Sequence, residues 1–366
     1  MTGPSLILSA RRSPIAPRNG ALSQLSIEEL AAPVLIAAMA DAGVSHADID
    51  ELIVANSLGG GGNPARIIAL KANLPNRVAG LSFDRQCVGG LDALLIGDAL
   101  IRSGRCNLVI AGGAESYSRQ PLRFKTFADG RAPVQYFQAR FTPWEDRDPD
   151  MAQAADLLAK RLNISRADQD AWAIQSHANA ARAPRPHIVE MQGQSIDSFT
   201  RQLSDKHCKK AGVVCGDITA ANMAVAADGA AFVVMASAQW AAKRGLDGPR
   251  LRAGCTLGDD PEMPGLAPVL AIQQALAAAQ LQPKDITTAE IMEAFAVQAI
   301  ACQEGAEIDP SVVNLWGGAL ARGHPIGASG AVLAAQLFHQ MNSRGGYGLM
   351  AIAAAGGLGT AVVLEP

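Results

Sequence analysis

The stretch that decides the fold runs from residue 87 to 115, where "CVGGLDALLIGDALIRSG" (87–104) is followed by "NLVIAGGAE" (107–115). A turn containing glycine opens a helix of small residues, and a buried strand then ends in two glycines. The same pattern returns late in the chain as "PIGASGAVLAAQLFHQMNSRGG" (325–346) and "LMAIAAAGGLG" (349–359). This repetition predicts two copies of one α/β unit.

The segments before these two stretches correspond as well. The first copy contains "LIAAMADAGVSHADIDELIVAN" (35–56), and the second contains "AIQQALAAAQLQPKDITTAEIMEA" (271–294). Each gives a helix, a short break, an Asp-Ile pair and an apolar strand. Unrelated α/β segments share some of this pattern, but here four elements recur in the same order, which favours a duplication.

A more polar region separates the two copies. It contains the helix-breaking segments "FTPWEDRDPD" (141–150) and "ARAPRPH" (181–187). Helices are predicted over 156–162 and 166–181, with Ser165 as the N-cap of the second. We therefore predict a first half over 1–118 and 217–247, an inserted loop domain over 119–216, and a second half over 248–366.

Composition excludes several classes of protein. Among the 366 residues, 49% are hydrophobic and 18% charged, which excludes a largely disordered chain. The net charge of -3 gives no indication of a nucleic-acid or membrane partner. No apolar run reaches the roughly 20 residues of a membrane-spanning helix, and no export signal is visible, so we expect a cytoplasmic protein. The six cysteines form no C-x-x-C pair, so we predict no metal site and reduced thiols.

Cys87 is the first candidate for chemistry. It lies where the polar segment "FDRQ" meets the helix that begins at "VGG". A thiol at a helix N-terminus is expected to have a lowered pKa, because the free N–H groups favour the thiolate. Gly89 and Gly90 would let another backbone approach. The alternative is an inert buried cysteine.

His324 is the second candidate, within "GGALARGHPIGASG" (317–330). A histidine in such a turn can present its ring to a cleft and act as the general base for Cys87, whereas the alternative is a surface loop histidine. Glu293 follows an apolar strand. It could orient a ring N–H, hydrogen-bond a loop, or be an exposed charge at a helix start.

Two glycine clusters raise the question of a phosphate-binding loop. The residues 59–62 lack the lysine of a P-loop, and a strand rather than a helix follows the glycines at 356–359. Nucleotide hydrolysis and dinucleotide binding are therefore not predicted.

Taken together, these motifs resemble the thiolase family (acetyl-CoA acetyltransferases and 3-ketoacyl-CoA thiolases) over nearly the whole chain. The resemblance rests on the two motifs around Cys87 and His324 and on three further segments in family order. These segments are "LILSARRSPIAPRNGALSQLSIEEL" (6–30), "GDITAANMAVAADGAA" (216–231) and "IMEAFAVQ" (291–298).

The resemblance implies an α/β thiolase fold: two duplicated βαβαβαββ halves in a five-layered α-β-α-β-α core with an inserted loop domain. It implies that a thioester acylates Cys87, that His324 activates the thiol, and that the backbone N–H groups of Cys87 and Ala355 form an oxyanion hole. Glu293 and Gly323 take supporting roles. The substrate is a coenzyme A thioester or a carrier-protein phosphopantetheine, without a bound cofactor. Family members are typically dimers or tetramers.

The sequence departs from the family pattern at several positions. Ala353 replaces the second catalytic cysteine, which deprotonates the acceptor, and Met292 replaces the asparagine that holds a water in an oxyanion hole. Ala224 and Val225 replace a Ser-Gly contact to pantetheine. The remaining departures are Asp150 in place of a loop histidine, Arg322 in place of a leucine, and Gly89 in place of serine or alanine.

These departures affect one half of the reaction. A general base contributes about 10²–10⁴-fold and an oxyanion donor about 10²–10³-fold, so Claisen chemistry is expected to be weak. We predict an acyltransferase that loads Cys87 and passes the acyl group to an acceptor. The alternatives are an ordinary thiolase with a substitute base, such as Cys302 or Glu293, and a non-catalytic scaffolding subunit. Acyl-chain length and acceptor are not predicted.

Overall fold

The first half of the chain alternates strands and helices in the predicted order. The computed structural model describes residues 3–366. The elements are β1 (Leu6–Arg12), α1 (Ile27–Asp41), β3 (Glu51–Ala55), α2 (Pro64–Lys71), β4 (Leu81–Phe83), α3 (Gly89–Arg102), β5 (Leu108–Glu115) and β10 (Ala227–Ala236). This series is the βαβαβαββ unit expected from the sequence.

The second half repeats the unit, except that a single β-bridge takes the place of one strand. Its elements are β11 (Arg250–Gly258), α8 (Ala267–Ala279), β12 (Ile286–Ile291), α9 (Ala296–Gly305), α10 (Ala319–Arg322), α11 (Ser329–Arg344), β13 (Tyr347–Ala354) and β14 (Leu358–Glu365). Where β4 lies parallel to β3 in the first half, a single parallel bridge joins Val313 to Ala289 of β12.

The strands form one sheet path in the order β12-β13-β14-β11-β1-β10-β5-β3-β4, and the short β2 (Ala16–Pro17) pairs with β10. In the first half, β10 pairs antiparallel with β1 and with β5, and β5 pairs in parallel with β3. In the second half, β14 pairs antiparallel with β11 and with β13, and β13 pairs in parallel with β12. Within the sheet, the pairing of Leu6 in β1 with Arg250 in β11 joins the two groups of strands. The shared topology confirms the predicted duplication.

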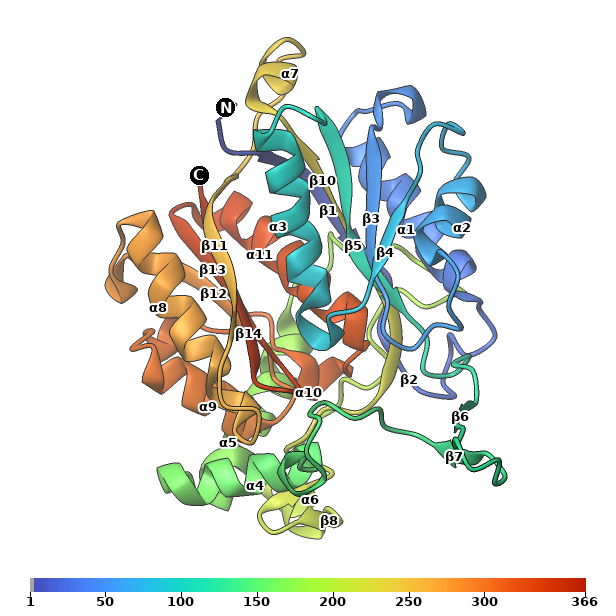
Figure 1. The fold of residues 1–366 in the computed structure, drawn as a ribbon. Helices are drawn as coiled ribbons and strands as arrows, with labels where there is room; N and C mark the ends of the chain where they lie inside the picture. Colours follow the sequence, from blue (N-terminus) through green and yellow to red (C-terminus); the bar gives the residue numbers. More distant parts are fainter. Residues whose placement is uncertain (1–2) are drawn as a thin grey trace.

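Helices α3 and α11 lie between the two groups of strands, as Figure 1 shows, while α1 and α2 cover one outer face and α8 and α9 the other. This arrangement gives the expected α-β-α-β-α layers. A Cβ on Gly90 would lie 2.5 Å from the backbone nitrogen of Ala331, so the first turns of α3 and α11 touch backbone to backbone. The two helix N-termini therefore meet in the middle of the molecule.

The inserted segment between β5 and β10 lies mostly along one end of the core (Figure 1). Ser165 caps α5 (Arg166–Arg182) as predicted, in a capping box with Asp168. The helix predicted over 156–162 begins earlier, at Met151 of α4 (Met151–Leu162), because the Asp150 side chain accepts the N–H of Ala152.

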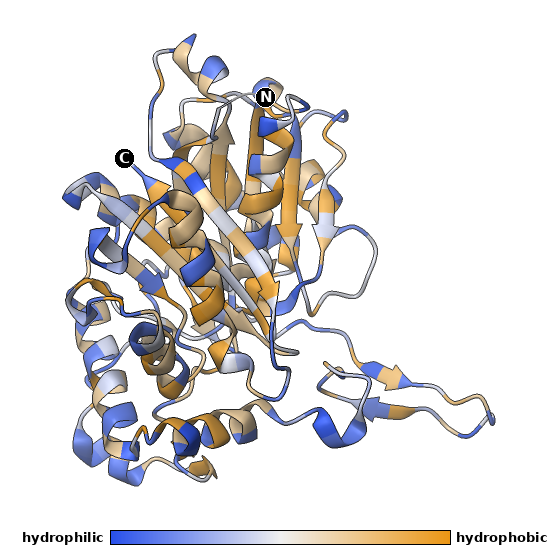
Figure 2. Cartoon of the chain, turned by 60° about the vertical axis from the view of Figure 1, so that its left-hand side comes forward, coloured by the Kyte–Doolittle hydropathy of each residue, from blue (hydrophilic) through white to orange (hydrophobic). Residues whose placement is uncertain are grey.

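A hairpin of β6 (Arg123–Lys125) and β7 (Val134–Tyr136) projects from the body (Figure 2). The remaining elements are α6 (Asp205–Lys210), β8 (Val213–Cys215), β9 (Ile218–Thr219) and, beyond β10, α7 (Ala238–Ala242). The domain boundaries at 119 and 216 stay a prediction. Over residues 3–366, every helix is too short or too polar to cross a membrane.

Candidate active site

Cys87 lies in a single 3₁₀ turn (Gln86–Val88) that runs directly into α3. Gln86 has a φ of 53°, a left-handed conformation that costs a non-glycine residue about 1–3 kcal/mol. The carboxylate of Asp84 accepts its N–H at 2.7 Å and holds the turn. A Cβ on Gly89 would lie 2.8 Å from the Cβ of Ala55. The turn therefore lies close against β3, which agrees with glycine at this position in place of the family's serine or alanine.

His324 reaches the same point from the other half of the chain. Its Nε2 lies 3.0 Å from the Sγ of Cys87, across 237 residues of sequence. Gly323 before it has a φ of 110°, and a Cβ there would lie 2.7 Å from the Cβ of Ala227, so this position needs glycine. The backbone N–H of His324 donates to the carbonyl of Val225 at 2.8 Å.

Ser329, at the start of α11, is a site residue that sequence reasoning missed. Its Oγ lies 2.6 Å from Nδ1 of His324 and donates to the carbonyl of Pro325 at 3.3 Å. A thiol at Cys87 donates to an unprotonated Nε2, which leaves the ring proton on Nδ1, facing Ser329. This contact was not predicted from the sequence, because a serine at the start of a helix is normally interpreted as a capping residue.

The pair rests in its neutral form. Burial raises the pKa of Cys87 to about 12, and the negative charges of Glu115 and Asp84 act in the same direction. Burial also lowers the pKa of His324 to about 4. The expectation of a lowered thiol pKa was wrong, because desolvation outweighs the favourable N–H group of the turn. Forming a thiolate at Cys87 would therefore require its proton to pass to a base, and Nε2 of His324 lies within hydrogen-bond distance of the sulfur.

Glu115 is a second residue that sequence reasoning missed. It is fully buried at the end of β5, and its carboxylate accepts the N–H groups of Ser57 (2.9 Å), Leu58 (3.0 Å) and Gly327 (3.0 Å). Asn56 donates to it as well, at 2.6 Å. Burial raises the pKa of Glu115 to about 7, while the N–H groups oppose this. Glu115 thus ties the loop after His324 to the first half. The signal available in the sequence was an acidic residue at the end of a strand predicted to be buried, which indicates a carboxylate with hydrogen-bond partners.

Cys87 and His324 line a cavity of about 560 Å³. Of the substituted family positions, Ala353 and Ala224 lie on its wall, together with Ala355. Met292 does not line it and is 1% exposed within the apolar core. The inserted segment and the second half contribute a mainly apolar part of the wall: Phe137, Phe141, Met151, Ala154, Ala155, Leu158 and Phe295.

Glu293 and Cys302 lie elsewhere. Both oxygens of the buried Glu293 carboxylate are occupied, one by Trp172 and Asn314 and the other by Ser176. Of the three roles considered for Glu293, the structure therefore gives it that of a loop anchor. Cys302 is buried, with its pKa raised to about 12, and donates to the carbonyl of Gly265. Neither side chain lines the cavity, so neither is placed to serve as a substitute base.

No cluster of three or more potential metal ligands occurs within residues 3–366.

The chain matches known proteins over nearly its whole length. The family model for the thiolase N-terminal domain matches residues 5–239, and that for the thiolase C-terminal domain matches 249–366. A Bacillus subtilis protein with the provisional name acetyl-CoA C-acetyltransferase YhfS is 37% identical over 99% of both chains. Staphylococcus aureus VraB, provisionally named for the same activity, is 34% identical over 98% of both.

Solved structures match equally well. The crystal structure of a Bacillus anthracis acetyl-CoA acetyltransferase has a TM-score of 0.90 and 31% identity, covering 100% of this chain and 99% of that one. Human mitochondrial 3-ketoacyl-CoA thiolase in complex with CoA has a TM-score of 0.92 and 28% identity, covering 99% of this chain and 98% of that one.

Proposed function

Since this chain belongs to the thiolase family, we propose that it is an acyltransferase that loads an acyl group onto Cys87 from a coenzyme A thioester. The observation that carries this proposal is the 3.0 Å distance between Nε2 of His324 and Sγ of Cys87. At that distance the imidazole can accept the thiol proton while the sulfur forms a bond to the thioester carbonyl carbon.

Cys87 and His324 together account for the bond changes and proton transfers of the acylation step. Attack by sulfur gives a tetrahedral oxyanion and an imidazolium at His324. The carbon–sulfur bond to CoA then breaks, and Nε2 returns its proton to the leaving thiolate. Ser329 would hold the ring during both transfers.

The oxyanion would be stabilised by the backbone N–H groups of Cys87 and Ala355. Both residues line the cavity, and Gly356 and Gly357, which follow Ala355, have φ values of 77° that set the β13–β14 turn. Such fixed donors are typically worth about 10²–10³-fold each. Because they belong to the backbone, side-chain substitution leaves them in place.

The acceptor half is where this chain departs from the family. Ala353 brings no base to the cavity wall, and Met292 is buried in the core. We therefore propose an acceptor that needs no carbon deprotonation by the second cysteine. It would be an oxygen, nitrogen, aromatic-carbon or thiol nucleophile, or a malonyl-type thioester whose decarboxylation itself gives the carbanion.

An ordinary acetyl-CoA acetyltransferase is the second candidate, favoured by the provisional names of YhfS and VraB. It requires a base from the cavity wall other than Cys302 or Glu293. A non-catalytic scaffold is the third, and the placement of Cys87 against His324 argues against it. A scaffold predicts that Cys87→Ala keeps the biological activity.

Isotope exchange tests the acylation half without knowledge of the acceptor. Labelled free CoA is incubated with unlabelled acetyl-CoA and the protein. The proposal predicts that label enters acetyl-CoA, that longer acyl-CoA substrates rank by fit to the cavity, and that Cys87→Ala abolishes the exchange. Repeating the assay with acyl-pantetheine on a carrier protein separates the two donor classes. Absence of exchange with every donor would contradict the proposal.

We also propose that the protein is a homo-oligomer, as the family resemblance implies. The edge strand β4 ends the sheet, and Leu81 on it is 40% exposed. Ile67 and Leu70 of the neighbouring α2 are 48% and 47% exposed. Light scattering on the wild type and on Leu70→Glu tests this edge as the contact, and a monomeric wild type would contradict it.

A further inference from the structure

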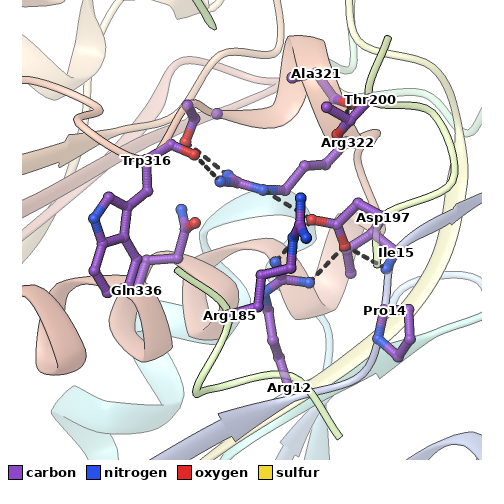
Figure 3. A network of polar contacts seen from close by, with 12 residues as sticks. Arg12, Pro14, Ile15, Arg185, Asp197, Thr200, Trp316, Ala321, Arg322 and Gln336 are labelled. Carbon is purple, nitrogen blue, oxygen red and sulfur yellow. Dashed lines mark hydrogen bonds and ion pairs between the residues drawn. The ribbon is translucent and has the colours of Figure 1, made fainter. Parts of the chain in front are cut away.

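Arg322, the residue that departs from the family leucine, forms a buried cluster of polar contacts (Figure 3). It ends α10, two residues before His324, and is 3% exposed. Its Nε pairs with the carboxylate of Asp197 at 3.0 Å. Nη1 donates to the carbonyl of Gly317 at 2.7 Å, and Nη2 donates to the carbonyl of Trp316. Every nitrogen of the guanidinium is therefore engaged.

Asp197 connects this arginine to the rest of the fold. It belongs to the inserted segment, and Arg12 of β1 binds its two oxygens at 2.6 and 2.8 Å. The backbone N–H of Ile15 donates to it as well, at 2.8 Å. Burial acts to raise the pKa of Asp197, but Arg12 and Arg322 hold it below its usual value, so the carboxylate stays ionised. The other acids that act on Arg322 are Glu290 and Glu293.

The segment that Arg322 anchors has little intrinsic stability. Helix α10 has four residues, and Gly323, in a conformation that other residues avoid, is all that separates it from His324. A helix this short depends on tertiary contacts. Thr200 of the inserted segment donates to the carbonyl of Ala321 at 3.0 Å, so Thr200 and Asp197 hold the end of α10 together.

Stability alone is a poor explanation for a buried arginine here. Burying a charged pair often costs as much as the pairing returns, and apolar residues of similar size can replace such pairs without loss. What the guanidinium adds is direction, because its planar fork fixes three acceptors at once.

We propose that Arg322 is a positioning residue. By binding Asp197 and the carbonyls of residues 316 and 317, it fixes the end of α10 and thereby keeps the imidazole of His324 at hydrogen-bond distance from Cys87. This inference uses the Cys87–His324 pair of the proposed function. It predicts that Arg322→Leu folds, because Arg12 and Asp197 remain as a balanced pair, but that His324 loses its fixed position.

The test is alkylation of Cys87 by iodoacetamide, followed by peptide mass mapping between about pH 6 and about pH 9. No acyl donor is involved. In the wild type the rate should be nearly independent of pH, because neutral His324 accepts the proton throughout this range. In Arg322→Leu the rate near pH 7 should fall roughly tenfold or more and then rise about tenfold per pH unit, as hydroxide replaces the base.

Arg252→Leu is the matched control. Arg252 is partly buried, whereas Arg322 is fully buried, but it likewise binds a carboxylate (Glu365) and a backbone carbonyl (Ala279), and it does not line the cavity. Its variant should keep the flat wild-type profile. A merely structural role for Arg322 would lower the melting temperature and leave the profile flat, which would overturn the inference.

Two further outcomes are distinguishable. A wild-type rate that itself rises tenfold per pH unit would count against the Cys87–His324 pair, and so against the proposed function. If Arg322→Leu does not fold, Thr200→Val takes its place, since it removes one contact to Ala321 without an ionic change. It should show a smaller loss in the same direction, and an unchanged profile would overturn the positioning role.

Discussion

Replacing Ala353 by cysteine should restore carbon–carbon cleavage. Ala353 lies on the cavity wall and pairs across the β13–β14 hairpin with Gly359, so a cysteine at this position would add a thiol to the wall of the cavity that also contains Cys87. A general base contributes about 10²–10⁴-fold, or about 3–5 kcal/mol of transition-state stabilisation. Because Met292 stays in the core and supplies no oxyanion donor, we expect a gain near the lower limit, about 10²-fold.

The assay is CoA-dependent cleavage of acetoacetyl-CoA by the wild type, Ala353→Cys and Ala353→Ser. The serine variant has nearly the same volume but no base of suitable pKa, so it should match the wild type. A wild type that cleaves as fast as Ala353→Cys would refute the reasoning, because it would mean that another base already serves the acceptor half. A gain in Ala353→Ser equal to that of Ala353→Cys would show that shape, not basicity, was limiting.

Three other changes have defined outcomes. Ser329→Ala removes the partner of Nδ1 of His324 and should slow alkylation of the nucleophile about tenfold, measured by mass spectrometry at neutral pH. Gly323→Ala places a Cβ 2.7 Å from that of Ala227 at a φ of 110° and should cost about 1–3 kcal/mol of unfolding free energy in urea titrations. His177 is buried, and burial lowers its pKa from 6.5 to about 4, so the unfolded chain binds the extra proton between these values and stability falls as pH falls through them. His177→Gln should therefore lose about 3 kcal/mol less than the wild type between pH 6.5 and 4, and an equal loss would contradict the pKa assignment.

The features that the sequence predicted best are those with a strong local signal. The helix at Gly89, the buried strand ending at Glu115 and the repeat around residue 330 follow from hydrophobic periodicity and glycine placement. The pairing of Cys87 with His324 was considered from the two motifs and implied by the family resemblance, and Nε2 of His324 lies 3.0 Å from Sγ of Cys87 in the structure.

What the sequence did not predict depends on burial and on long-range contacts. The thiol pKa at Cys87 was expected to fall, but the cost of desolvation is a property of the packed cavity and leaves no trace in the local pattern. The role of Glu293 could not be predicted either, since two of its partners, Trp172 and Ser176, come from an inserted helix more than 110 residues away. The sequence identified Arg322 only as a departure from the family pattern, because its ion pair with Asp197 is a long-range contact that depends on the fold.

The most direct measurement is the intact mass of the protein after brief incubation with acetyl-CoA and acid quenching. The account predicts a gain of one acetyl group, mapped to the peptide that contains Cys87 and absent in Cys87→Ala. It also predicts that added free CoA removes the group, since the loading step is reversible. A protein that never gains acyl mass with any CoA or carrier thioester, or gains it at a residue other than Cys87, would contradict the central claim.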